Sequence, residues 1–252
     1  MFIKTCYNIN TIKKGAEYEK IIKCRGGGNL TAQNKGFTLA EVLVTLGIIG
    51  VVSAMTIPTL MQNYQRKSYV TQLHKVYNEL NQALLQYQTD KNAVNLKEAG
   101  LTTNEACGEF FKKYFKIVQD CGNTSTPCFA ASYKKISGVN SYFTCQGSCV
   151  VVANGAALGM FSGYYTSDAG NVIRISVDIN GSKGPNVLGR DAFTLFLYPN
   201  GIIDDLASDK SLLPPFSKET REVEYEACTG TNSGNWHGCF GYLLNDNWEM
   251  NY

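Results

Sequence analysis

The sequence is poor in the residues and motifs that most enzymes use for acid–base and nucleophilic chemistry. Only two of its 252 residues are histidines, His74 and His237. It contains no Gly-x-Ser-x-Gly elbow, no phosphate-binding loop and no His-Glu-x-x-His pair. These absences remove the usual signatures of serine hydrolases, nucleotide-binding enzymes and zinc peptidases. We therefore expect a protein that is not an enzyme.

Charge is distributed unevenly along the chain. The first 36 residues hold seven Lys and Arg against two Glu, whereas residues 37–252 hold sixteen basic against nineteen acidic residues. The positive-inside rule expects such an N-terminus to stay in the cytoplasm while the remainder crosses the membrane. The mildly acidic remainder offers no overall basic surface, so a nucleic-acid partner is not expected.

One long apolar run follows the basic N-terminus. It contains a single carboxylate, Glu41, and no further charge before Arg66. Residues 37–57 form a helix of about 30 Å if they are helical, which is the thickness of a bilayer's hydrocarbon core. The alternative is a secretory signal cut after Val52-Ser53-Ala54, which would leave a chain that begins at Met55. A carboxylate inside a membrane segment costs about 2.5–3.5 kcal/mol, so Glu41 needs a partner.

The motif at the start of this run resembles the processing site of type IV pilins and type II secretion pseudopilins. It reads Gly36-Phe37-Thr38-Leu39-Ala40-Glu41, and apolar sequence continues to Pro58. The resemblance covers residues 35–90 and implies that a prepilin peptidase cuts between Gly36 and Phe37 and methylates the new amine. It implies that Glu41 neutralises this amine, within one subunit or between neighbours, and that Pro58 kinks the helix.

The resemblance also implies a function. The chain is expected to be a structural subunit, major or minor, of a type IV pilus or a type II secretion pseudopilus. The implied partners are homologous subunits, prepilin peptidase, an inner-membrane assembly platform with its ATPase, and membrane lipid. The precursor is expected to span the membrane once with its head outside, and later to reach a filament or the cell surface. One alternative is a DNA-uptake pseudopilin, and another is an anchored binding or adhesive domain that does not polymerise.

Beyond Pro58 the sequence predicts that the helix continues as an amphipathic segment. Apolar residues recur every three or four positions, with polar residues between them. The predicted stripe contains Leu60, Tyr64, Val70, Leu73, Val76, Tyr77, Leu80, Leu84 and Tyr87. These observations divide the chain into four expected segments. They are a leader at 1–36, a transmembrane or filament-core helix at 37–57, its amphipathic continuation at 58–91, and an exported β-rich head at 92–252.

The pattern of the head predicts strands and hence an α+β fold, and the resemblance implies an antiparallel sheet packed on the long helix. Strands are expected on both sides of Asn154-Gly155, a tight-turn dipeptide. The other predicted elements are strands at 172–177 and 193–198, a hairpin at Asn200-Gly201, a loop at 91–103 and an irregular stretch at 204–221.

Nine cysteines divide between the leader and the head. Cys6 and Cys24 lie in the leader and are expected to be free thiols. Seven cysteines in an exported domain indicate disulfides. We predict the local pairs Cys121–Cys128, Cys145–Cys149 and Cys228–Cys239, with Cys107 left over, although sequence does not fix this connectivity. Zinc is a weaker alternative because no Cys-x-x-Cys pair occurs. His237 is expected to be a loop residue.

A Gly-rich loop at 178–191 offers the oxygens of Asp178, Asn180 and Asp191 as candidate calcium ligands. The loop departs from an EF-hand, since Lys183 stands where that motif requires Gly and Gly189 where it requires Glu. A long turn between two strands is the favoured interpretation. We therefore expect no cofactor, with calcium as the alternative.

Overall fold

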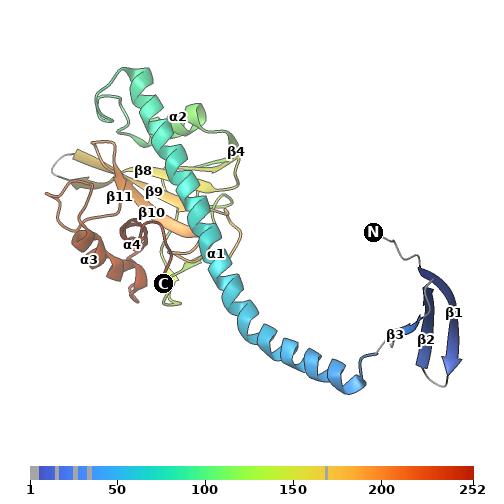
Figure 1. The fold of residues 1–252 in the computed structure, drawn as a ribbon. Coiled ribbons are helices and arrows are strands. Elements are labelled where there is room, and N and C mark those ends of the chain that lie inside the picture. Colours follow the sequence, from blue (N-terminus) through green and yellow to red (C-terminus); the bar gives the residue numbers. More distant parts are fainter. Residues whose placement is uncertain (1–5, 15–16, 25–27, 33–35, 168–169) are drawn as a thin grey trace. The chain divides into compact units, whose positions relative to one another are not determined.

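The computed structural model describes residues 6–14, 17–24, 28–32, 36–167 and 170–252, and the chain divides into two compact units, Met1–Leu60 and Met61–Tyr252 (Figure 1). Each unit is described here by itself. Lys35 of the predicted motif lies outside the described residues. So do the side chains of Cys6 and Cys24, and the prediction of free thiols is therefore not tested.

Residues 6–32 contain a small antiparallel sheet, which is not among the elements expected from the sequence. Its strands are β1 (Cys6–Lys14), β2 (Glu17–Cys24) and β3 (Gly28–Ala32), paired in the order β1-β2-β3. The residue types agree with strands, because Ile and Tyr occur in both β1 and β2 and favour extended backbone.

The long helix α1 (Leu39–Lys91) contains Pro58 in its interior. The sequence predicts a helix from Phe37 to about Asp90, and the observed ends agree within two residues. Helix therefore continues on both sides of the proline.

The head is built on a six-stranded antiparallel sheet with the strand order β11-β10-β9-β8-β7-β4. Its strands are β4 (Ile117–Gly122), β7 (Ser148–Val152), β8 (Ala157–Ser167), β9 (Gly170–Asp178), β10 (Ala192–Leu197) and β11 (Ile203–Asp204). A separate pair is formed by β5 (Tyr133–Lys134) and β6 (Asn140–Ser141). The predicted α+β fold is confirmed.

Both predicted Asn-Gly turns connect neighbouring strands. Gly155 has φ 90° between β7 and β8, and Gly201 has φ 84° between β10 and β11. Glycine reaches positive φ without the steric cost that a Cβ imposes, so these dipeptides fix where the strands turn.

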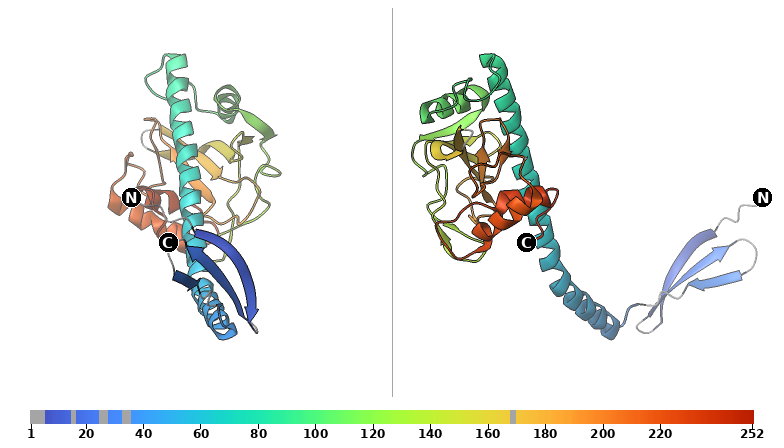
Figure 2. Two further views of the ribbon diagram at one scale, coloured as in Figure 1. Left: turned by 45° about the vertical axis from the view of Figure 1, so that its right-hand side comes forward. Right: turned by 90° about the vertical axis from the view of Figure 1, so that its left-hand side faces the viewer.

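Residues 70–87 of α1 pack across one face of the sheet (Figures 1 and 2). The buried α1 residues are Val70, Leu73, Val76, Leu80, Ala83, Leu84 and Tyr87. They meet the inward-facing residues of the strands, which in β9 are Ile173, Ile175 and Val177. The predicted stripe is correct from Val70 onward. It is wrong at Leu60 and Tyr64, which are each 70% exposed.

The opposite face of the sheet is covered by loops. One group of buried residues around Phe129, Tyr133 and Phe143 packs behind β8 and β10, and a second around Phe196, Tyr198 and Phe216 packs behind β10. Every residue of β10 is therefore buried, on both sides of the sheet. This explains why its sequence is almost continuously apolar.

Three short helices complete the head, and the sequence analysis predicts none of them. They are α2 (Asn104–Tyr114), α3 (Lys218–Thr229) and α4 (Cys239–Asn245). Capping signals are present: Thr103 Oγ1 accepts a hydrogen bond from Ala106 N, and Ser217 Oγ accepts one from Thr220 N, each at 3.2 Å. The predicted irregular stretch at 204–221 is therefore wrong from Lys218 onward, where α3 begins.

Candidate processing and assembly segment

The predicted cleavage site lies just outside α1. Gly36, Phe37 and Thr38 are exposed and not helical, and Leu39 is the first helical residue. The Phe37 side chain is 88% exposed. The bond between Gly36 and Phe37 therefore lies on non-helical, exposed backbone.

Thr38 and Glu41 form a reciprocal cap at the start of α1. Glu41 Oε2 accepts hydrogen bonds from Thr38 N at 2.8 Å and from Thr38 Oγ1 at 2.9 Å. In return, Thr38 Oγ1 accepts a hydrogen bond from Glu41 N at 3.2 Å. This is a capping box with Thr38 as the N-cap, and α1 begins at the next residue, Leu39. The N-cap role of Thr38 is not among the expectations from the sequence, although the Thr-x-x-Glu pattern is typical of a capping box.

The Glu41 carboxylate therefore has a partner before any cleavage takes place. Cleavage after Gly36 would create an amine on Phe37, the residue directly before Thr38, whose N–H donates to this carboxylate. The predicted pairing of Glu41 with the Phe37 amine, within or between subunits, is compatible with this geometry and stays a prediction. The assembly role of Pro58 likewise stays a prediction.

The helix that follows is apolar and exposed around its whole circumference. Leu43, Leu46 and Ile49 are each 60% exposed. An 18-residue window of α1 has a mean hydropathy of 2.0 and no buried residue, which makes α1 a candidate membrane span by length and composition. A helix that is hydrophobic all round is stable in lipid or among other helices. Exposure of this apolar surface to water is energetically unfavourable.

The three predicted disulfides are present in the head. They join Cys121 to Cys128, Cys145 to Cys149 and Cys228 to Cys239. Sulfur atoms joined in this way are not thiolates, so these cysteines do not form the alternative zinc site. Cys107 is a buried free thiol, and burial raises its pKa to about 12. A thiol with such a pKa is inert rather than reactive.

The candidate calcium loop uses its carboxylates for its own hydrogen bonds. Asp178 accepts bonds from Tyr133 Oη at 2.6 Å and Asn180 N at 3.2 Å. Asp191 accepts bonds from Val187 N at 2.7 Å and Asn186 N at 2.8 Å. Burial raises the pKa of Asp178 to about 7 and also raises the pKa of Asp191.

A calcium cage needs six to eight oxygens with little competition from hydrogen-bond donors. Asn180 Oδ1 is buried without a donor, but the carboxylate oxygens around it are already engaged. Among the described residues there is no group of three His, Cys, Asp or Glu side chains that could hold a metal ion. The carboxylates of the loop are engaged in hydrogen bonds within the protein, and calcium stays an untested alternative.

Comparisons with known proteins agree with this geometry. Residues 31–57 match the family model for the prokaryotic N-terminal methylation motif. Residues 59–251, well over half of the chain, match the model described as "Family of unknown function (DUF6613)". The chain belongs to this family.

A curated protein is similar to part of this chain. Over 71 residues the chain is 37% identical to prepilin peptidase-dependent protein D of Escherichia coli (strain K12). That stretch is 28% of this chain and 43% of the relative, so the comparison covers less than half of that protein. No solved structure matches the chain. The N-terminal segment is therefore pilin- or pseudopilin-like, whereas the head is characteristic of DUF6613.

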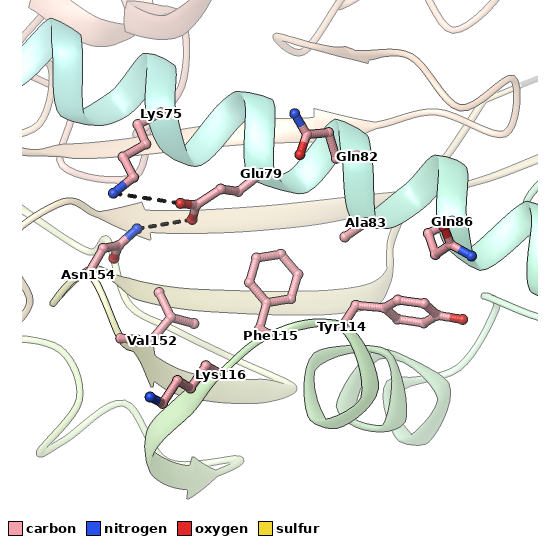
Figure 3. Close-up of a pocket in the computed structure, with 11 residues that line it drawn as sticks. Lys75, Glu79, Gln82, Ala83, Gln86, Tyr114, Phe115, Lys116, Val152 and Asn154 are labelled. Atoms are coloured by element: carbon pink, nitrogen blue, oxygen red, sulfur yellow. Dashed lines mark hydrogen bonds and ion pairs between the residues drawn. The ribbon is translucent and has the colours of Figure 1, made fainter.

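The DUF6613 head also carries an open groove of about 610 Å³ between α1, the segment after α2 and the turn after β7 (Figure 3). Figure 3 shows the Phe115 ring pointing toward α1. The one carboxylate in the lining, Glu79, lies 3.9 Å from Lys75 Nζ and accepts a hydrogen bond from Asn154 Nδ2 at 3.0 Å. The lining holds no Ser, Cys or His, so it offers no nucleophile paired with a base.

Proposed function

We propose that this chain is the precursor of a structural subunit of a pilus-like or pseudopilus-like filament. One observation carries the proposal: an exposed, fully apolar helix begins directly after a methylation-motif cleavage site. The apolar surface has no partner among the described residues of its own chain, so it is stable only in lipid or against the same helix of other subunits.

The partners follow from this role. Prepilin peptidase cuts between Gly36 and Phe37 and methylates Phe37, and an inner-membrane platform with its ATPase extracts the subunit from the bilayer. The precursor spans the membrane once, with the leader in the cytoplasm and the head outside. In this scheme the chain is the substrate of a processing enzyme and is itself not an enzyme.

The filament system is the finer part of the proposal. A surface pilus and a type II secretion pseudopilus are both consistent with the N-terminal segment, and a DNA-uptake pseudopilus uses the same kind of helix. The disulfide-bonded head, with 12% aromatic residues in the chain, suits a minor or tip subunit as well as a major one. An anchored adhesive domain that does not polymerise is the competing function.

The deciding experiment is the intact mass and N-terminal peptide of the protein from membranes of its native host. We expect a chain that begins at Phe37 with one added methyl group. A Gly36→Leu chain should stay uncut, because the residue before the cleaved bond is changed. The control chain, Gly50→Ala, should be cut normally. An added Cβ meets nothing within 4 Å at either position, so neither substitution creates a steric clash. A chain that begins at Met55 would show ordinary secretion instead.

Polymerisation is tested separately by shearing cells and collecting extracellular filaments. The proposed subunit is found in the sheared fraction, whereas a solitary anchored domain stays with the membranes. A Glu41→Gln chain that is cut normally but fails to enter filaments would assign Glu41 a role in assembly. Normal filaments from that variant would remove the role.

A further inference from the structure

A small polar pocket lies where α1 enters the head. It is lined by Gln62, Gln65, Arg66 and Tyr69 of α1 and by Arg190 from the loop before β10, and its volume is about 250 Å³. Two guanidinium groups, two side-chain amides and one phenol converge on it. All of these side chains can donate hydrogen bonds, and no carboxylate is part of the lining.

No carboxylate is part of the lining of this pocket, although the charge of Asp191 acts on the phenol of Tyr69. Neither Arg66 nor Arg190 forms an ion pair within the part of the chain that the structure describes. The adjacent Asp191 is fully buried and accepts hydrogen bonds from the backbone of its own loop. Arg66 also lines a neighbouring pocket on α1 together with Lys67, and there a carboxylate, Glu249, is part of the lining.

The position of the pocket along the sequence adds a second constraint. The expected membrane segment, residues 37–57, has about the length that a bilayer requires. Gln62, the first residue of the pocket, follows its end by five positions, which is about 7.5 Å along a helix. Tyr64 is 70% exposed, and exposed Tyr at the end of an apolar helix is typical of the lipid headgroup level.

Positive residues are disfavoured on the translocated side of a membrane helix by the positive-inside rule. Arg66 and Lys67 nevertheless stand within a few residues of that end. An anion at the same depth compensates Arg66 and Arg190, and phospholipid phosphates are the anions present there. Arg is well suited to this task because its planar fork binds phosphate oxygens in pairs.

We infer that this pocket binds the phosphate group of an anionic phospholipid in the leaflet opposite the leader, while the precursor is still in the membrane. The inference rests on the membrane-anchored precursor of the proposed function. Arg66 and Arg190 bind the phosphate oxygens, and the amides of Gln62 and Gln65 donate to the remaining acceptors. The bound lipid holds the base of the head at the membrane surface until the subunit is extracted.

The test uses the full chain in a neutral detergent, with lipid binding followed by native mass spectrometry. Phosphatidylglycerol and phosphatidylcholine with the same acyl chains are the two probes. The wild-type chain is expected to retain phosphatidylglycerol in preference. Arg190→Gln should lower this affinity about tenfold or more, because a charged hydrogen-bond donor is lost. Lys67→Gln, the matched control one residue from Arg66, should change it by no more than about twofold.

Further arms identify what is recognised. Arg190→Lys keeps the charge but loses the fork, so an intermediate affinity is expected, and glycerol 3-phosphate should displace the lipid. Equal retention of the two lipids, or equal losses in Arg190→Gln and Lys67→Gln, would overturn the inference. If inorganic phosphate binds as tightly as the lipid, the ligand of the pocket is the free ion and the lipid inference is overturned. Arg190 is exposed, so an unchanged melting temperature confirms that the variant is folded.

A flotation experiment separates this inference from the proposed function. A chain that does not float with membranes would overturn the membrane-anchored precursor itself. A chain that floats but shows no preference for phosphatidylglycerol would overturn only the lipid pocket.

Discussion

Residues 39–64 and residues 70–87 of α1 belong to one continuous helix but differ in what their apolar side chains contact. Leu46 in the first segment is 60% exposed, whereas Leu80 in the second is fully buried against the sheet. The first segment is apolar on every side and the second on one side only. A one-sided stripe can be satisfied by a single sheet, whereas an apolar cylinder needs lipid or several neighbouring helices. The difference separates residues that pack against the head from residues that are exposed on an apolar helix.

The largest effect is expected from the same substitution in both segments. Leu80→Ala should lower the free energy of unfolding of the head by about 2–5 kcal/mol, because it leaves a cavity in the core. Leu46→Ala should change it by less than about 0.5 kcal/mol. Urea unfolding of the full chain in detergent, followed by near-ultraviolet circular dichroism, measures both. Similar losses in the two variants would contradict the division of α1.

A second prediction concerns the buried carboxylate of Asp178. Its pKa is raised from 3.8 to about 7 in the folded head, with burial as the main cause. Between these pH values the folded state binds more protons than the unfolded state, so this group lowers stability as the pH rises from 4 to 7. The slope is at most about 1.4 kcal/mol per pH unit.

Asp178→Asn removes this contribution and leaves those of Asp191 and Asp205, whose pKa values are also raised by burial. We therefore expect the stability of the variant, relative to the wild type, to increase between pH 4 and pH 7. Urea titrations at several pH values measure the difference. Parallel curves for the two proteins would show that Asp178 is ionised throughout.

A third prediction compares two helix caps. Thr103→Ala removes the cap of α2 in the head and should lower the free energy of unfolding by about 1 kcal/mol. Thr38→Ala removes the cap of α1 and should leave the unfolding of the head unchanged. It should instead speed amide hydrogen exchange at Glu41, whose N–H binds Thr38 Oγ1. Unchanged exchange would mean that the capping box does not order the start of α1.

The smallest effect is expected in the groove of Figure 3. The ion pair between Lys75 and Glu79 is partly exposed on α1, with 63% and 37% of the side chains accessible. Such helix pairs contribute about 0.3–0.5 kcal/mol. Lys75→Gln should therefore lower stability by this amount at low salt and by less at 1 M salt. A loss above about 1 kcal/mol would indicate that the groove is more than an open surface.

The sequence predicts the elements whose signals are local. Asn154-Gly155 and Asn200-Gly201 place two turns correctly because their backbone preference needs no tertiary context. Cysteines close in sequence, such as Cys145 and Cys149, pair as predicted. The short helices are not predicted because their apolar positions are few. Thr103 and Ser217, the N-caps of α2 and α3, are the local signals that indicate these helices.

The rest depends on contacts that are distant in sequence. Asp178 resembles a metal ligand in its own loop, yet its partner is Tyr133, which lies on β5. Leu60 and Tyr64 fit the stripe of α1, but the head does not reach them. The pocket of Arg66 and Arg190 joins residues more than a hundred positions apart. Only the fold brings such pairs together.

The three disulfides of the head have a mechanical consequence. They close loops with sequence separations of 7, 4 and 11 residues. Within the part of the chain that the structure describes, none of them joins α1 to the sheet. A pulling force that enters through α1 is therefore resisted by the packed face from Val70 to Tyr87, and not by a covalent link. Such a force would separate α1 from the sheet before it stretched any disulfide.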